Sequence, residues 1–574
     1  MTEKRVFCWR PGNMINAVRT SFCRPLRAFR LDFWTLILIA ALGAAVLFLV
    51  YPLSSLLLSA FQDVRTGYFT FTHFERFFSR PFFYRALFRS MSVTIWTTVL
   101  AVLLGASLGY LTTVYKVKAK GLVDILVIIS MLSPPFIGAY SWILLAGRNG
   151  YLTRFFRIYL DIELPTIYGF GGIVLAMTLS AFPLIYLFTR GALKKVDASL
   201  LEASESLGCS PIKKAVTMTI PLITPTILAA ALLVFIDAFT NFGTPMLLGE
   251  GYVVMPVLVF NEFMSELGGR PNFAAALSVI MVAITAVLFM IQKYIVSRKS
   301  FTMSSLRPIQ ATQLKGSANV LMHIFIYTAV ALATIPKIIV IYTSFRATAG
   351  PMFVDGFSLE SYERIFRNLG SSIRNTYVYG LIAIAVIVIL ALLIAYLVVR
   401  RKSMLTSMLD YIIMLPFVIS GSVIGITLIL AFNTRPLLFV GTPFILILAF
   451  VLRRLPYALR SSTAILHQIS PSLEEAAISL GDTPLKSFFK VTAVMMMPGV
   501  ISGAILSWIT IINELNASIL LFTTPTRTMT VVIYQEVLRA LYGTAAALAT
   551  ILTLTTVISI IIFFKITGKT EISL

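Results

Sequence analysis

The residues that could perform chemistry are few, and they form no catalytic pattern. Gly568-Lys569-Thr570 matches the end of a phosphate-binding loop, but Phe563 occupies the place of the first glycine that such a loop requires. There is no nucleophile elbow, no His-Glu-x-x-His and no pair of carboxylates on one helix face. The three histidines are scattered, and three cysteines are too widely spaced for a metal site or a disulfide framework: Cys8, Cys23 and Cys209. We predict no catalytic residue, no bound metal and no cofactor in this chain.

Polar groups inside long apolar segments are a second candidate set, because charge is expensive in a membrane and usually has a function there. The main cases are Asp237, Lys337 and Glu514, with Asn241 close to the first. We expect Asp237, Asn241 and Glu514 to line a transport pathway or its outer gate. The alternative is that they lie at the outer ends of their helices and simply reach water. Lys337 is expected to snorkel to the interface or to pair internally.

A repeated segment organises the rest of the chain. Residues 197–214 and 470–487 agree, without gaps, at nine of eighteen positions. Each copy is predicted to form a short helix that starts with a Ser-x-x-Glu capping box, at Ser199 and Ser472, and stops at a glycine. Leucine, alanine and serine at positions i, i+3, i+4 and i+7 give each helix a small apolar stripe. A duplication of this kind predicts two related halves.

The repeated Glu-Ala-(Ala/Ser)-x-x-x-Gly pattern resembles the "EAA" loop of permease subunits of binding-protein-dependent ABC importers. The resemblance covers both copies and nearly the whole chain, and the fused, two-half form is most similar to the ferric-iron permeases. It implies that the two helices are coupling helices that dock with ATP-binding subunits. The residues carried over are Glu202, Ala203, Ser204, Gly208, Glu475, Ala476, Ala477 and Gly481. Ser204 departs from the pattern, which has alanine there.

Composition places the chain in a membrane. Of its 574 residues 58% are hydrophobic and 12% charged, with a mean hydropathy of +0.90. A soluble protein of this size could not bury so much apolar surface. The net charge of +23 does not indicate a nucleic-acid partner, since 16 of 17 lysines fall at the chain ends or on the side of the repeated helices. That bias is the positive-inside pattern of a bacterial inner-membrane protein with both termini in the cytoplasm.

Apolar runs of about 20 residues can span the hydrocarbon core. Six are predicted in each half, so the fold class is an all-α polytopic membrane protein with about 12 transmembrane helices in two parallel six-helix repeats. Several of them carry helix-breaking prolines: Pro134-Pro135 interrupts the third, Pro183 and Pro456 align in the fourth and tenth, and Pro416 lies in the ninth. The predicted spans are 33–60, 91–114, 121–146, 167–189, 220–241 and 273–296, then 320–344, 375–399, 408–432, 437–460, 491–514 and 541–564.

Four segments follow from these spans. We predict a cytoplasmic N-terminal segment (1–30), a first permease half (31–296), a cytoplasmic linker (297–318) and a second half (319–566). The resemblance implies a type I permease core at about 87–296 in the first half and about 371–564 in the second. The linker is polar, basic and punctuated by glycine and proline, as an exposed connection should be.

The predicted outer side carries features that suit a docking partner. Residues 255–262 and 529–536 align and are expected to form short interfacial helices at the outer mouth. The large outer loops are rich in arginine, which can pair with carboxylates of a partner or remain solvated at the lipid headgroups. Four arginines are candidates for contact with a binding protein: Arg76, Arg80, Arg364 and Arg367.

The favoured function is therefore the membrane-spanning subunit of an ATP-driven importer. Its implied partners are two copies of an ATP-binding cassette subunit, which would use the ATP, a periplasmic or lipid-anchored binding protein, and membrane lipid. Ferric iron is the first expectation for the cargo, and a phosphonate or another anionic, phosphorylated small molecule is the alternative. A different class, an ion-coupled secondary carrier, would need more ionisable groups within the membrane than the sequence offers.

Overall fold

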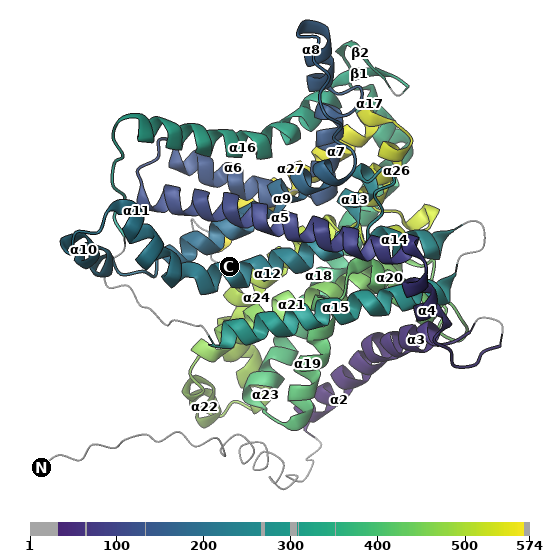
Figure 1. The fold of residues 1–574 in the computed structure, drawn as a ribbon. Helices are drawn as coiled ribbons and strands as arrows, with labels where there is room; N and C mark the ends of the chain where they lie inside the picture. Colours follow the sequence, from purple (N-terminus) through teal and green to yellow (C-terminus); the bar gives the residue numbers. More distant parts are fainter. Residues whose placement is uncertain are drawn as a thin grey trace, which may run out of the picture.

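The computed structural model describes residues 32–63, 66–132, 134–265, 270–298, 307, 309–350 and 352–567. The predicted N-terminal segment with Cys8 and Cys23, residues 299–306 and 308 of the linker, and Gly568-Lys569-Thr570 lie outside these ranges. The described chain is helical apart from one short hairpin and its connections (Figure 1).

Within the described ranges, the first half has its six expected spans and six shorter helices, α4, α8, α10, α11, α13 and α14. Two five-residue π-helical segments, η1 and η2, occur within spans. The elements are α2 (Phe33–Ala45), η1 (Val46–Val50), α3 (Tyr51–Ala60), α4 (Thr72–Ser79), α5 (Pro81–Val114), α6 (Lys120–Leu132), α7 (Pro135–Ala146), α8 (Tyr151–Tyr159), α9 (Phe170–Leu193), α10 (Ala198–Ser206), α11 (Pro211–Lys214), η2 (Ala215–Thr219), α12 (Ile220–Thr240), α13 (Gly243–Leu248), α14 (Met255–Met264) and α15 (Pro271–Arg298).

The second half repeats this order and adds an antiparallel hairpin, in which Arg346 pairs with Phe357 and Ala349 with Met352. Its elements are α16 (Gly316–Ser344), β1 (Arg346–Ala349), β2 (Met352–Phe357), α17 (Glu360–Arg364), η3 (Ile365–Leu369), α18 (Gly370–Arg400), α19 (Met404–Val418), α20 (Gly421–Phe432), α21 (Pro443–Gln468), α22 (Ser472–Ser479), α23 (Pro484–Ser487), η4 (Phe488–Thr492), α24 (Ala493–Ile512), α25 (Ser518–Leu521), η5 (Thr524–Thr526), α26 (Met529–Leu538) and α27 (Tyr542–Thr567).

Among the described residues, nine helices are long and apolar enough to cross a membrane, and two bent helix pairs, α6 with α7 and α19 with α20, can each supply one more. The remaining predicted span, the tenth (437–460), corresponds to α21. It has 26 residues, enough to cross a membrane, but is less apolar because it contains Arg453, Arg454 and Arg460. The span pattern agrees with the polytopic all-α prediction.

The two bent pairs arise in different ways. In half one the break falls at Pro134-Pro135, as predicted, and Pro135 is the first residue of α7. In half two Pro416 lies inside α19 and does not end the helix. The break comes later, at Ser420, whose hydroxyl accepts a hydrogen bond from the Val423 amide and so caps α20 (3.2 Å). The helix axis changes direction by 115° between α19 and α20.

Each half is built around three helices that pack on one another: α5, α9 and α12 in the first, and α18, α21 and α24 in the second. The first membrane span of each half also packs against the other half. α3 packs on α20 of half two as well as on α15, and α16 packs on α6 and α7 of half one as well as on α27. The halves are therefore interlocked rather than placed side by side.

The helices predicted at 255–262 and 529–536 are present as α14 and α26, but they are mostly buried rather than interfacial. The amide of Met255 donates to Ser90 Oγ on α5 (2.7 Å), and the amide of Met529 donates to Thr376 Oγ1 on α18 (2.8 Å). The same bond thus fixes the start of each short helix to the long helix of its own half. Hydroxyls at these buried positions satisfy amides that a helix start leaves unpaired.

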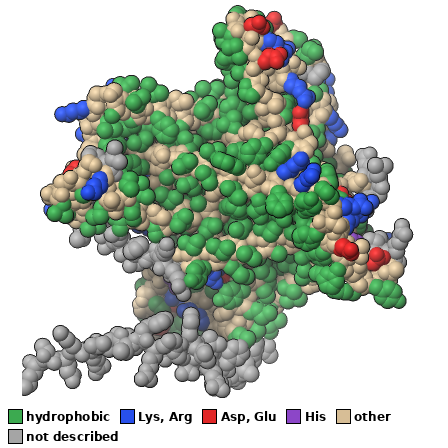
Figure 2. All heavy atoms as spheres, in the orientation of Figure 1, with side chains coloured by type: hydrophobic (Ala, Val, Ile, Leu, Met, Phe, Trp, Pro, Cys, Tyr) green, Lys and Arg blue, Asp and Glu red, His purple; other side chains and the backbone are tan. Residues whose placement is uncertain are grey.

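The short helices divide between two ends of the molecule. α10 and α22 lie at the left of Figure 1, and α8, the β1–β2 hairpin and α4 lie at the right or top. In this view, green hydrophobic side chains form a broad band between the two ends, and most of the blue and red charged side chains lie outside it (Figure 2). The band is the surface expected to face lipid.

Candidate functional site

The repeated helices α10 and α22 stop in the same way. Gly208 and Gly481 have φ angles of +80° and +97°, in the left-handed region that glycine adopts without strain. The glycine amide bonds the carbonyl three residues back, and the next amide bonds the carbonyl five residues back, with distances of 2.9–3.1 Å in both copies. This is a Schellman motif. A Cβ at either glycine would meet nothing within 4 Å, so only the backbone conformation requires glycine.

The starts of these helices differ from the prediction. α10 begins at Ala198, and its N-cap is Asp197, whose carboxylate accepts from the Ser199 amide (2.9 Å). α22 begins at Ser472, follows Pro471, and has no side-chain cap. The predicted capping boxes at Ser199 and Ser472 are therefore wrong, because both serines lie inside the helix. In half one a carboxylate two residues earlier takes the role.

Both helices present an apolar residue to the outside at the turn before the glycine. Leu207 is 85% exposed and Leu480 is 90% exposed. The glutamate and the first alanine of each motif, Glu202-Ala203 and Glu475-Ala476, are also exposed. Ser204 is buried, which explains why a small residue is needed there. Exposed leucines on a polar helix outside the lipid band are typical of a protein contact surface.

The segments that follow the two helices are also duplicated. η2 and η4 are five-residue π-helical turns whose first residues, Ala215 and Phe488, are 273 positions apart, the spacing of the repeat itself. π-Turns often occur at functional positions in helices. The side-chain hydrogen bonds that anchor α22 to the neighbouring helices, however, are not repeated for α10. Glu474 of α22 accepts hydrogen bonds from the Tyr396 hydroxyl and from Thr492 Oγ1, whereas half one has Leu201 at the position of Glu474.

A buried charge cluster surrounds Glu514, one of the predicted pathway residues. Its side chain is 4% exposed and contacts the guanidinium groups of Arg453 and Arg454 on α21, the latter at 2.7 Å. Its other carboxylate oxygen accepts from the Ala517 amide (3.1 Å). Arg453 in turn packs on the start of α20, where a Cβ at Gly421 would lie 2.6 Å from Nη1. Glu514 is therefore held and charge-compensated, as a buried carboxylate must be.

The equivalent place in half one is a small crevice without arginine. Ser180 and Ala181 occupy the positions of Arg453 and Arg454 and line the crevice with Asp237 and Asn241. Asn241 Oδ1 accepts from the Thr244 amide (3.1 Å), which is the same i to i+3 bond that Glu514 makes. Asn241 and Glu514 are 273 positions apart, the spacing of the repeat, and share a local geometry in which each residue caps the turn after α12 or α24.

Asp237 links the two halves electrostatically. It is exposed, unlike Glu514, because it opens onto the crevice. Arg453 and Arg454 of half two both act on its charge. The charges of these two arginines thus act on a carboxylate of each half, although direct contact is made with Glu514. Sequence reasoning missed them, although two consecutive arginines in a predicted span, three residues before Pro456, were a visible signal.

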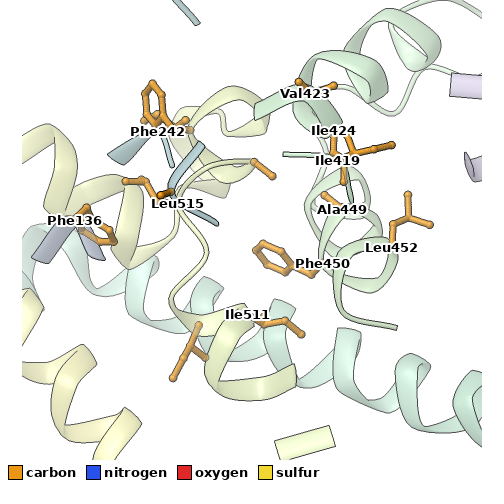
Figure 3. Packing of buried hydrophobic residues seen from close by; sticks show 14 of the residues in the cluster. Phe136, Phe242, Ile419, Val423, Ile424, Ala449, Phe450, Leu452, Ile511 and Leu515 are labelled. Carbon is orange, nitrogen blue, oxygen red and sulfur yellow. The ribbon is translucent and has the colours of Figure 1, made fainter. Parts of the chain in front are cut away.

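A layer of apolar side chains from both halves lies beside this cluster. Figure 3 shows Phe136 and Phe242 of half one near Leu515 of half two. A Cβ at Gly243 would lie 2.9 Å from Phe136 Cβ and 3.2 Å from Leu515 Cδ2. The segments after α12 and α24 therefore meet closely, without room for a side chain between them.

Other charged residues of the spans form local pairs. Lys337 Nζ donates to the Ser130 carbonyl (2.6 Å), which confirms that it pairs internally. Asp124 on α6 pairs with Arg190 on α9 (2.6 Å), and Asp410 on α19 pairs with Arg460 on α21 (3.3 Å). These two pairs tie the third span to the fourth in each half, and the sequence analysis did not identify them.

The four arginines predicted to contact a binding protein are not clustered. Arg76 stacks over the rings of Phe83 and Phe273, and Arg364 pairs with Glu360 at 3.0 Å. Arg80 and Arg367 are exposed. They come from the first outer loops of the two different halves.

The two halves thus form an interlocked, duplicated helical fold in which each half carries one exposed helix. The chain belongs to the family of binding-protein-dependent transport system inner membrane components, whose model matches residues 101–301 and 387–569. Each half contains one match, so this is a fused, two-half permease, a multi-pass protein of the inner membrane with a type I permease fold.

Relatives of known name support this assignment over most of the chain. The ferric transport system permease protein FbpB of Actinobacillus pleuropneumoniae is 27% identical over 541 residues, covering 92% of this chain and 77% of that protein. The Fe(3+)-transport system permease protein FbpB 2 of Haemophilus influenzae is 26% identical over 494 residues, covering 85% of this chain and 91% of that protein. The molybdenum transport system permease protein ModB of Escherichia coli matches 37% of this chain at 24% identity.

Proposed function

We propose that this permease is the translocation subunit of an ATP-driven importer, and that α10 and α22 each dock with one copy of an ATP-binding subunit. The observation that carries the proposal is the pair of Schellman-capped helices at one end of the molecule, each with a leucine that is at least 85% exposed. Two equivalent docking helices suit a motor of two identical subunits. Closure of the motor on ATP would draw the helices together and reorient the pathway between them.

The end that carries α10 and α22 is proposed to be cytoplasmic, with both termini and the linker on that side. The lysine distribution supports this orientation. Cys209 follows Gly208 directly and is half-buried at that end. A membrane-impermeant thiol reagent should leave it unlabelled in intact cells and label it in inverted vesicles. Labelling of Cys209 from outside would reverse the orientation.

The pathway is proposed to run between the halves, past Asp237, Asn241 and Glu514. Arg453 and Arg454 hold Glu514 and act on Asp237, so separation of the halves on this side would leave Asp237 without its counter-charge. An uncompensated carboxylate opening onto the pathway attracts a cation. The halves thus form a gate in which charge compensation accompanies closure.

Ferric iron is the proposed cargo, delivered by a periplasmic or lipid-anchored binding protein. The support is the naming of three relatives that match 84–92% of this chain as ferric or Fe(3+) permeases. Uptake of radiolabelled iron by a strain that expresses this chain with its neighbouring ATPase and binding-protein genes tests the cargo. Uptake of molybdate or a phosphonate instead of iron, under the same conditions, would replace the proposed cargo without changing the transport class.

The coupling proposal is tested by exchanging Gly208 or Gly481 for aspartate. A left-handed φ costs a non-glycine residue about 1–2 kcal/mol, and the carboxylate adds negative charge at the negative end of the helix. We expect each variant to reach the membrane but to lose most of the co-purified ATPase and of the uptake. Gly191→Asp is the matched control, because Gly191 is also open on its Cβ side but has no positive φ. Normal co-purification and uptake in both coupling variants would refute the docking assignment.

A further inference from the structure

Half one has a hollow of about 820 Å³ at the end opposite α10 and α22. Its walls come from the end of α7, from α8 and the loop that follows it, and from the loop before α14. The lining is about equally polar and apolar and includes four glycines: Gly147, Gly169, Gly249 and Gly251. The volume is in the range of ligand-binding pockets.

Positive charge dominates the walls of this pocket. Three arginines, Arg89, Arg148 and Arg157, line it with one carboxylate, Glu250, so the lining carries a net charge of +3 − 1 = +2. Arg148 pairs with Glu250 at 2.7 Å, yet its side chain remains 74% exposed. Arg157 lies on α8 and is exposed. The pocket thus has guanidinium groups available to an acidic partner.

A second observation also indicates a ligand. Thr153 lines the pocket and is only 9% exposed, and its hydroxyl has no hydrogen-bond partner among the described residues. A buried hydroxyl without a partner costs free energy unless something else supplies the bond.

The equivalent region of half two is built differently. Residues 433–442, which join α20 to α21, number ten and contain no helix, whereas 147–169 join α7 to α9 and include α8. Asn375 stands at the place of Arg89 and donates to the carbonyls of Pro525 and Arg527, as Arg89 donates to the Gly251 carbonyl. In both halves a side chain of the long helix, α5 or α18, thus holds the loop before α14 or α26, but only half one, as far as the chain is described, lines a pocket there with arginines.

The rim of the pocket reaches the other half. Tyr151, the first residue of α8, packs against the ring of Phe353 on β2 with centroids 6.3 Å apart. The face of α8 that carries Tyr151, opposite the pocket residues Thr153 and Arg157, also exposes three apolar side chains: Phe155, Ile158 and Tyr159. α8 stands out from the bundle at the top of Figure 1, where a protein arriving from this side would meet it first.

We propose that this pocket receives an acidic side chain from one lobe of the solute-binding protein and thereby decides which lobe docks on which half. The inference rests on the proposed function. A duplicated scaffold offers a two-lobed, hinged binding protein two nearly equivalent orientations. A basic pocket in only one half makes the two orientations unequal. In one of them the acidic lobe contacts the arginines of half one, and in the other it contacts half two, whose described residues form no such pocket. A docked protein surface, unlike a small anion, would also cover the largely exposed Arg148.

The test uses the complete transporter, with its ATPase, in lipid nanodiscs, and measures stimulation of ATP hydrolysis by the binding protein. In R148E/R157E we expect the half-maximal concentration of binding protein to rise about tenfold, with a weaker dependence on salt. The matched control is R435E, an equal charge reversal in the equivalent loop of half two, for which we expect less than about a twofold change. Arg89 is left intact because it also fixes the loop before α14.

Orientation is read by cross-linking from Asn149→Cys, at the exposed lip of the pocket, with Cys8, Cys23 and Cys209 replaced by serine. A single cysteine in either lobe of the binding protein supplies the partner thiol. We expect one lobe to cross-link in the parent and both lobes in R148E/R157E.

The outcomes separate the two proposals. If the binding protein stimulates the parent, but R148E/R157E changes neither stimulation nor the lobe that cross-links, the orientation inference is wrong. It is also wrong if phosphate or citrate binds the pocket by calorimetry while cross-linking stays with one lobe in both forms. If the parent itself is not stimulated by the binding protein, the proposed function fails instead.

Discussion

The two halves of this permease share their backbone devices but not their charges. In both halves the exposed helix ends in a Schellman motif and is followed by a π-turn, and the two π-turns are 273 positions apart. In both halves a side-chain hydroxyl also accepts a hydrogen bond from the first amide of α14 or α26. The arginine pair of α21, in contrast, has Ser180 and Ala181 as its counterparts, and the arginine pocket beside α8 belongs to half one.

The difference separates two kinds of constraint. Devices that shape the backbone are needed wherever the same helix must turn, so duplication preserves them. A buried charge needs its counter-charge only where it lies, so Arg453 and Arg454 compensate Glu514 in half two and are not needed in half one, where the aligned residue is the neutral Asn241. We infer that the motor meets a nearly symmetric surface, while the cargo and its delivery protein meet an asymmetric one.

The largest expected effect comes from breaking the charge centre of half two. In R453Q/R454Q, Glu514 stays buried without a counter-charge, which should cost about 3–5 kcal/mol of stability. Thermal unfolding of the purified protein measures the loss, and Ser180→Ala, at the equivalent place in half one, is the control with little expected change. Adding E514Q should recover most of the stability. If the triple variant is no more stable than the double, charge compensation is not what holds this region together.

A device that is duplicated should matter equally on both sides. Ser90→Ala and Thr376→Val each leave the amide that starts α14 or α26 buried and unpaired, at a cost of about 1–3 kcal/mol. The two shifts in unfolding temperature should agree within error. Thr94→Val is the matched control, because Thr94 is buried one turn further along α5 and its hydroxyl makes no hydrogen bond. A loss confined to one half would show that the repeated bond is not equivalent.

Anchoring of α22 tests whether the motor surface is truly symmetric. Tyr396→Phe removes the hydroxyl that donates to Glu474, and a hydrogen bond to a charged group is worth about 1.5 kcal/mol or more. We expect retention of the ATPase to weaken about tenfold, the change in equilibrium that this energy gives. Tyr110→Phe on α5 is the equivalent change in half one, where Leu201 replaces Glu474, and should have little effect. Equal losses in both would mean that the tyrosines serve only packing.

The smallest effect concerns the residue after each glycine, Asp482 in half two and Cys209 in half one. Lys486 donates to Asp482 and, with Lys490, holds the pKa of that carboxyl below its usual range. Any contribution of this ion pair to the free energy of unfolding is therefore present above a pH of about 4 and is lost only as the pH falls further. Asp482→Asn should leave uptake within about twofold, with an unchanged profile between about pH 6 and 8. A pH-dependent defect in that range would contradict this.

The sequence predicted what depends on local pattern. Hydropathy located the spans, and the glycine after each repeated helix indicated its left-handed stop. Asp197 and Ser199 are both good N-caps, two residues apart, so preference alone could not choose between them. The break near Ser420 was not predicted, since Pro416 is the nearest helix breaker and proline is tolerated within membrane helices.

What depends on distant partners was not predictable in the same way. Arg453 and Arg454 pair with Glu514, some 60 positions away, and their charges also act on Asp237 in the other half. The packing of each first span against the other half cannot be read from hydropathy, because all faces of a membrane helix can be apolar and packing decides its neighbours. The pocket beside α8 required four separate segments to come together.

The packing of α3 and α16 against the opposite half also bears on how the protein is made. α3 emerges long before α20, its partner in half two, so half one cannot finish packing until most of the chain has been synthesised. Two copies of half one, if they paired, would bring two Asp237 residues together without the arginines of α21, and two copies of half two would assemble four arginines around two glutamates. Carrying both halves on one polypeptide fixes their ratio at one to one and favours the only pairing in which these charges cancel.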